Sequence, residues 1–177
     1  MNVFSLKPLD KNNLLNIDTL KIKNVHTLEG IESLINLNTL DINDSGLIFN
    51  YSPIAKLNNL KTLRIYNGNL DILSNLDSMD NVEIFHLIYP KTDSLKSLPL
   101  FPNVTSLTIN FSSYFALSVL KNFPRVEEFS LCLEGPLTVD GLEVISTLKT
   151  IKLDNCYIPN IGDFIKKAET KGIKVIM

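Results

Sequence analysis

The 177-residue chain has little of the chemistry that most catalytic and metal-binding sites use. It contains no tryptophan, two histidines and two cysteines. Candidate nucleophiles, bases and ligands are therefore few: His26, His86, Cys132 and Cys156. A cysteine nucleophile needs its histidine within about 3 Å. These four residues fall in four different units of the apolar repeat of this sequence. No Walker, GxGxxG, CxxC or HExxH motif occurs. We expect no enzyme activity, no catalytic residue, no cofactor and no metal site.

An excess of positive charge is also missing. Seventeen basic and nineteen acidic residues give a net charge of −2. Surfaces that bind nucleic acid or anionic membranes normally carry a basic excess, so neither partner is expected. The first residues show no basic leader followed by an apolar run, and no apolar run approaches the ~20 residues of a membrane span. We expect a cytoplasmic protein whose cysteines stay unpaired.

What the sequence does contain is a repeat of apolar residues. The stretch 60–70 has the pattern L-x-x-L-x-I, which recurs about every 22 residues. Position 1 of each unit falls at Ile17, Leu37, Leu60, Val82, Val104, Val126, Leu148 and Thr170. Positions 4 and 6 are apolar in every unit. Alternation of this kind is the period of a short strand, so positions 3, 5 and 7 should point to the opposite face.

This pattern resembles the leucine-rich repeat superfamily, in the 22-residue class shared with internalin-type bacterial proteins, over residues 14–177. The resemblance implies an α/β fold: a right-handed solenoid with a curved parallel β-sheet on its concave face and short helices or 3-10 turns on its convex face. Stacking is also required physically, because one unit cannot bury its own apolar face. We expect a single domain over 1–177, with an N-terminal cap at 1–16, seven repeats of about 22 residues at 17–169 and a terminal strand at 170–177.

The segments between the expected strands carry apolar residues three positions apart, which favours short helical turns on the convex side. The clearest helix is predicted at 161–172, where apolar residues at helical spacing precede a glycine stop.

The chain departs from the family at position 9, where an asparagine commonly joins neighbouring turns by hydrogen bonds. Here Asn24, Asn67 and Asn155 fall one residue earlier. Either the turn is shifted or the asparagine ladder is absent.

The outward face changes character along the array. Positions 5 and 7 are charged at its ends and mostly uncharged in the middle, and position 8 becomes aromatic or apolar in units four to six. An apolar centre rimmed by polar groups is usual for a protein interface. The alternative is that position 8 turns inward in these units. The predicted partner-binding residues are Arg64, Tyr66, His86, Ile88, Tyr89, Thr108, Phe111, Cys132 and Leu133.

Three functional hypotheses remain. The first is a monomeric, non-enzymatic module that binds a protein partner through its concave sheet, for example as an inhibitor or immunity protein. The second is a structural protein that self-associates through its terminal strand. The third, an enzyme, has only the few candidates named above.

Overall fold

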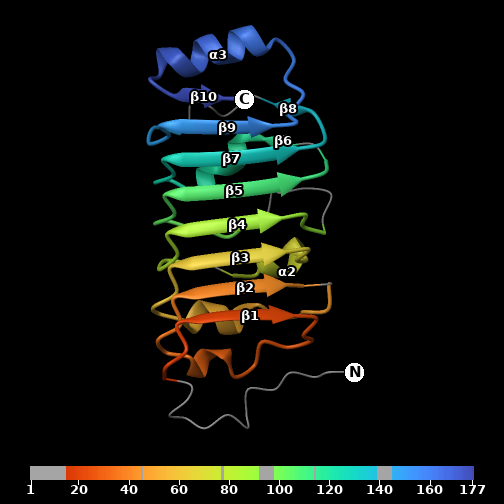
Figure 1. The fold of residues 1–177 in the computed structure, drawn as a ribbon, viewed down its shortest axis with the longest axis vertical. Helices are drawn as coiled ribbons and strands as arrows, with labels where there is room; N and C mark the ends of the chain where they lie inside the picture. Colours follow the sequence, from red (N-terminus) through yellow and green to blue (C-terminus); the bar gives the residue numbers. More distant parts are fainter. Residues whose placement is uncertain (1–14, 45, 77, 92–97, 114, 139–144) are drawn as a thin grey trace.

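The computed structural model describes residues 15–44, 46–76, 78–91, 98–113, 115–138 and 145–177. Within them each repeat contributes one strand to a single parallel sheet (Figure 1). The sheet has eight strands among the described residues, in the order β1-β2-β3-β4-β5-β7-β9-β10. They are β1 (Thr19–Lys23), β2 (Thr39–Asn43), β3 (Thr62–Tyr66), β4 (Ile84–Ile88), β5 (Ser106–Phe111), β7 (Glu128–Leu133), β9 (Thr150–Asp154) and β10 (Lys174–Ile176).

Equivalent positions of neighbouring repeats pair in register, so that Leu40 lies beside both Leu20 and Leu63. The last strand is an exception. Lys174 pairs with Thr150, which places β10 two residues later than the repeat spacing predicts. The two extra residues lie in the connection before β10, which contains a longer helix, α3 (Ile161–Thr170).

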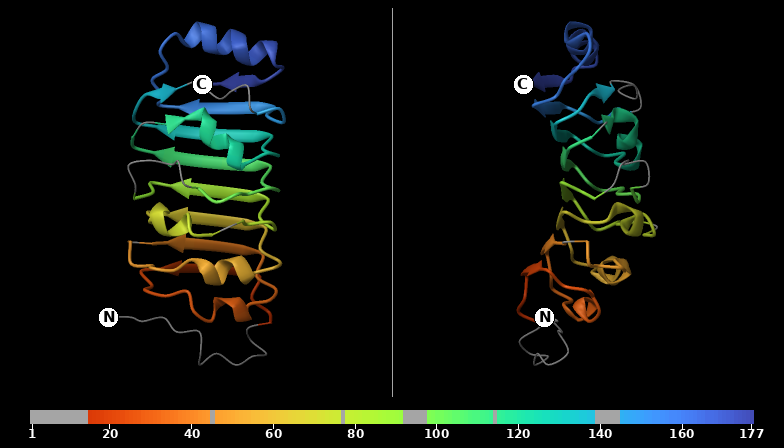
Figure 2. Two further views of the ribbon diagram at one scale, coloured as in Figure 1. Left: turned by 180° about the vertical axis from the view of Figure 1, so that it is seen from behind. Right: turned by 90° about the vertical axis from the view of Figure 1, so that its right-hand side faces the viewer.

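Short helical segments return the chain along the side opposite the sheet. They are η1 (Ile31–Ser33), η2 (Ser52–Lys56), α2 (Leu70–Leu73), η3 (Leu117–Asn122) and α3. A second parallel pair, β6 (Phe115–Ala116) with β8 (Leu137–Thr138), lies outside the main sheet. The side view in Figure 2 shows a bowed sheet with the strands on its concave side and most helical segments behind it. The predicted solenoid, with strands on one face and short helical turns on the other, is confirmed.

Helix α3 confirms the prediction for 161–172. It buries Phe164 and Ala168 at the last turn of the array. Its C-terminal end is followed by Gly172, whose φ of +72° is costly for other residues. The predicted N-terminal cap at 1–16, by contrast, falls almost entirely outside the described residues.

The core lies between the sheet and the convex segments. Positions 4 and 6 are buried from the second repeat to the seventh, whereas Leu20 and Ile22 in the first repeat are only partly buried. Three rings stack in the middle of the core: the centroids of Phe85 and Phe101 are 4.4 Å apart, and those of Phe101 and Phe123 are 5.2 Å apart. Alternation at positions 4 and 6 thus predicted the core correctly.

Strands end in three ways at position 8. Asn24, Asn67 and Asn155 have φ values of 54°, 56° and 54°, in the left-handed region that asparagine tolerates better than most residues. The shifted asparagines therefore turn the chain out of the strand. In β5 and β7 the strand instead continues by one residue, and Phe111 pairs with Leu133.

The second repeat has a third arrangement. Asp44 is fully buried, and its Oδ1 accepts hydrogen bonds from the backbone N–H groups of Gly46, Leu47 and Ile48 at 2.7, 2.8 and 3.3 Å. The hydroxyl of Tyr51 donates to Oδ2 at 2.6 Å. This carboxylate holds the turn after β2 in place of an asparagine.

Candidate functional site

The outward side chains at position 5 begin with a group of charges. Asp41 on β2 lies between two cations: Nζ of Lys21 is 3.4 Å from its Oδ2, and Nη1 of Arg64 is 2.9 Å from its Oδ1. His86 follows Arg64 on the next strand. Partial burial, aided by the positive charge of Arg64 and opposed by Asp41, lowers the pKa of His86 below its usual value near 6.5. His86 is therefore mainly neutral at pH 7.

The centre of the same face is uncharged. Thr108 and Ser130 continue the row at position 5, and both are partly buried. The parallel row at position 7 contains Tyr66, Ile88, Asn110 and Cys132, which are also partly buried. Charged residues return at the ends of the two rows, with Lys23 on β1 and with Lys152 and Asp154 on β9. The middle of the concave face is thus a half-exposed, neutral surface.

Two of the predicted partner-binding residues cannot contribute to that surface. Phe111 is 1% exposed and Leu133 is 0% exposed, because β5 and β7 run one residue further and turn position 8 into the core. The prediction of an exposed patch is wrong at these two positions, and the inward alternative holds there. Burying a side chain of this size stabilises the fold by about 1.5–3 kcal/mol. Tyr89 differs: it has φ 48° and remains 49% exposed.

The cysteines do not form a reactive pair with a histidine. His86 lies on β4 and Cys132 on β7, with β5 between them. Cys156 is partly buried, with Sγ 3.4 Å from the carbonyl oxygen of Asp154. Burial raises the pKa of its thiol to about 11, so it stays protonated near neutral pH. Both thiols are free.

Metal-binding clusters and membrane-spanning helices are both absent from the residues that the structure describes. No group of three His, Cys, Asp or Glu side chains could hold a metal ion there. None of the helices there is long and apolar enough to cross a membrane.

Two open hollows occupy the concave face. One, of about 400 Å³, lies toward its C-terminal end and is lined by Asn110, Ser130, Leu131, Cys132, Lys152, Leu153, Asp154, Ile176 and Met177. The other, of about 270 Å³, lies between the first three strands and is lined by Lys21, Ile22, Lys23, Asp41, Asn43 and Tyr66. Both are wide, shallow depressions that suit side chains of a protein better than an enclosed small molecule.

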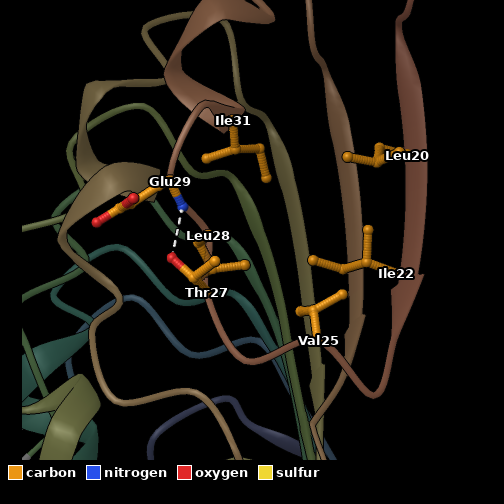
Figure 3. A pocket seen from close by; sticks show the side chains of 7 residues that line it. All are labelled: Leu20, Ile22, Val25, Thr27, Leu28, Glu29 and Ile31. Atoms are coloured by element: carbon orange, nitrogen blue, oxygen red, sulfur yellow. Dashed lines mark hydrogen bonds between the residues drawn. The ribbon is translucent and has the colours of Figure 1, made fainter. Parts of the chain in front are cut away.

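A third cavity lies inside the first repeat. Figure 3 shows Leu20 and Ile22 from β1 facing Ile31 and Leu28 across it, with the backbone N–H of Glu29 donating to Thr27. Its volume of about 10 Å³ is close to the minimum for one water molecule. This cavity is therefore a packing gap at the end of the core and no ligand site.

Comparison with known proteins adds to this geometry. No protein-family model and no curated protein sequence matches the chain. Among solved structures, internalin C2 of Listeria monocytogenes aligns over 96% of this chain and 83% of its own, with a TM-score of 0.56 and 20% identity. The fold is a leucine-rich repeat solenoid. A second internalin from the same organism, InlF, has 16% identity and a TM-score of 0.49, and this chain spans 62% of its length.

Most of the predicted partner-binding residues lie together on the concave face of this solenoid. They are Arg64, Tyr66, His86, Ile88, Thr108 and Cys132, with Tyr89 at the edge of the face. The prediction missed Lys23 and Asn43, which line the hollow over the first three strands. Both are at position 7, so the strand alternation that placed Tyr66 would have placed them too.

Proposed function

We propose that this protein is a non-enzymatic binding module that presents the concave face of its sheet to one protein partner. The observation that carries the proposal is the neutral, half-exposed centre of this face, flanked by charged residues. Interfaces commonly have this arrangement, with few charges at the core and a polar rim. Every strand of the sheet is hydrogen-bonded to its neighbours, so little ordering of the backbone is needed on binding.

The available area is consistent with a protein partner. Strands spaced about 4.8 Å apart and about 17 Å long give roughly 600 Å² over this sheet, and the adjoining loops bring the total toward the ~800 Å² that each side of a standard interface buries. The residues assigned to contact are Arg64, Tyr66, His86, Ile88, Tyr89, Thr108 and Cys132.

Within this class we favour an inhibitor or immunity protein, which acts by covering a surface of a toxin or an enzyme. Such a role needs a rigid complementary surface and no chemistry of its own. The proposal includes a cytoplasmic location and a monomeric state. Two free thiols support the location, because a reducing compartment keeps cysteines unpaired.

The test uses Ile88, which lies near the middle of the face. The wild-type protein would be used to capture its partner from cells of its source, and the affinity of the purified pair would be measured by calorimetry. Ile88→Arg should weaken binding at least about thirtyfold, because it places a charge in the desolvated centre of the interface.

Ile35 supplies a matched control. It is 56% exposed and lies outside the sheet, so Ile35→Arg should leave the affinity within about twofold. Light scattering on all three proteins would check that each remains monomeric. Unchanged partner affinity in the Ile88 variant would place the binding site away from the concave face.

A further inference from the structure

The hollow over the first three strands is lined mainly by hydrogen-bond donors. Lys21 and Lys23 border it from β1, Asn43 from β2 and Tyr66 from β3. Ile22 also borders the hollow, but its side chain faces the core on the other side of β1 (Figure 3). The remaining lining residue, Asp41, is the only acceptor that carries a charge.

The acceptors in the hollow are already engaged. One carboxylate oxygen of Asp41 binds Arg64 at 2.9 Å, and the other lies 3.4 Å from Lys21. The side-chain oxygen of Asn43 accepts a hydrogen bond from the amide of Asn67 at 3.3 Å, which leaves the Asn43 amide nitrogen as a donor.

The donors have capacity to spare. Across the part of the chain that the structure describes, no carboxylate lies within ion-pair distance of Lys23, and the Tyr66 hydroxyl has no hydrogen-bond partner. Lys21 is 77% exposed although it pairs with Asp41. The hollow therefore offers ammonium, amide and hydroxyl donors that can reach a ligand.

The local charge also departs from that of the whole chain. Positions 5 and 7 of β1, β2 and β3 carry three cations, Lys21, Lys23 and Arg64, against the one carboxylate of Asp41. This end of the face thus has a surplus of two positive charges in a chain whose net charge is −2. Complementary charges steer partners toward such a surface and fix the orientation in which they bind.

We infer that this hollow receives the carboxylate side chains of an acidic segment on the protein partner. This inference rests on the proposed function. A glutamate or aspartate would place its oxygens against Lys21, Lys23 and the Asn43 amide, in charge-assisted hydrogen bonds of about 2.7–2.9 Å. Its methylene groups would pack against the ring of Tyr66.

The rest of the same face favours an acidic protein segment over nucleic acid. Glu128 on β7 and Asp154 on β9 are exposed there, so a phosphate backbone crossing the sheet would meet negative charges. Duplex DNA carries a charge about every 1.7 Å and needs an extended basic footprint. An acidic cluster at one end of a mixed protein surface avoids this conflict.

The experiment measures fluorescence anisotropy of a labelled peptide of alternating Asp and Glu residues, added to the intact protein at low and at moderate salt. A peptide of the same length made of Asn and Gln is the uncharged comparison, and a single-stranded oligonucleotide of equal charge is the nucleic-acid comparison. The acidic peptide should bind most tightly, and added salt should weaken it.

Two charge reversals locate the site. Lys23→Glu should weaken binding of the acidic peptide at least about tenfold, since it replaces an attraction by a repulsion. Lys56→Glu makes the same change at an exposed residue of η2 on the convex side and should leave the affinity unchanged. Thermal melts of both variants would confirm that they are folded.

Three results would overturn the inference: no binding of the acidic peptide at low salt, equal losses in the two variants, or tighter binding of the oligonucleotide that depends on Lys23. Failure of the proposed function would appear differently. A captured partner that depends on Ile88 but not on Lys23 removes the acidic-segment inference alone. A partner indifferent to Ile88→Arg removes the concave-face function even if the acidic peptide binds.

Discussion

At the scale of single residues, the hydrogen-bonded pair Asp44 and Tyr51 stabilises the turn after β2, although both side chains are polar and buried. A buried carboxylate is costly unless its oxygens are satisfied, and here three backbone N–H groups and one phenol satisfy them. Burial and the neighbouring carboxylate of Asp44 raise the pKa of Tyr51 above its usual range, so the phenol keeps its proton and remains a donor.

Tyr51→Phe is expected to lower the free energy of unfolding by about 1.5–3 kcal/mol, because it leaves a charged oxygen without its partner in a buried site. Urea melts would measure the change. Tyr157→Phe removes the same hydroxyl from a side chain that is 70% exposed and should change stability by less than about 0.5 kcal/mol. Equal effects in the two variants would mean that the phenol of Tyr51 does not support Asp44.

Position 8 provides a second comparison between equivalent residues. Phe111→Ala should cost about 3–5 kcal/mol, since it empties a buried site in the core. Tyr89→Ala, at the same position of the preceding repeat, should cost less than about 1 kcal/mol because half of its side chain already faces solvent. Chemical denaturation of both variants checks the assignment, and a small loss at Phe111 would contradict its burial.

At the scale of elements, the sequence predicted the strands and the last helix because their apolar periods are unbroken. It did not predict how each strand ends. The choice at position 8 depends on the loop and on the next strand: Phe111 and Leu133 pair with each other and stay inside, whereas Tyr89 leaves the strand in a left-handed conformation. The sequence of a single repeat does not show that Phe111 and Leu133 stabilise each other's inward position across neighbouring strands.

The candidate site was predictable to the same extent. Alternation placed Tyr66, His86 and Ile88 on the outward face, because positions 5 and 7 follow directly from the strand period. The donor-lined hollow at Lys23 and Asn43 depends on which hydrogen bonds are already formed inside it, and those involve residues more than twenty positions apart. The sequence near Lys23 and Asn43 therefore does not predict which donors of the hollow remain available.

Replacing the glycine at each end of helix α3 by alanine should change the stability of the protein in opposite directions. Gly162 lies in the first turn, and a Cβ added there would meet no atom within 4 Å, so Gly162→Ala should stabilise the protein by about 0.5–1 kcal/mol. A Cβ at Gly172 also has room, but the φ of +72° makes Gly172→Ala destabilising by about 1–2 kcal/mol. Differential scanning calorimetry would resolve both shifts, and a shared sign would contradict the assigned end of the helix.

At the scale of the whole molecule, each repeat is supported by its two neighbours in the stack. Deleting 148–177 removes β9, α3 and β10 together, and it exposes the edge of β7 and the apolar side chains beneath it. We expect the shortened chain to lose most of its solubility, because an open strand edge beside a bare core promotes aggregation.

Soluble yield and light scattering of the shortened and intact chains provide the measurement. A soluble, monomeric product that lacks these residues would show that the last turn is not needed to close the core.

The in-register pairing of successive repeats also sets how quickly the molecule can form. Parallel sheets usually fold slowly because their strands must find partners far along the chain, but here each strand pairs with one that lies a single repeat away, as Leu40 does with Leu63. A separation of about 22 residues in a chain of this length gives a relative contact order near 0.12, at the boundary between helical bundles and mixed domains. Refolding on the millisecond scale is therefore compatible with an all-parallel sheet, because successive strands of the sheet among the described residues are joined by connections of about one repeat.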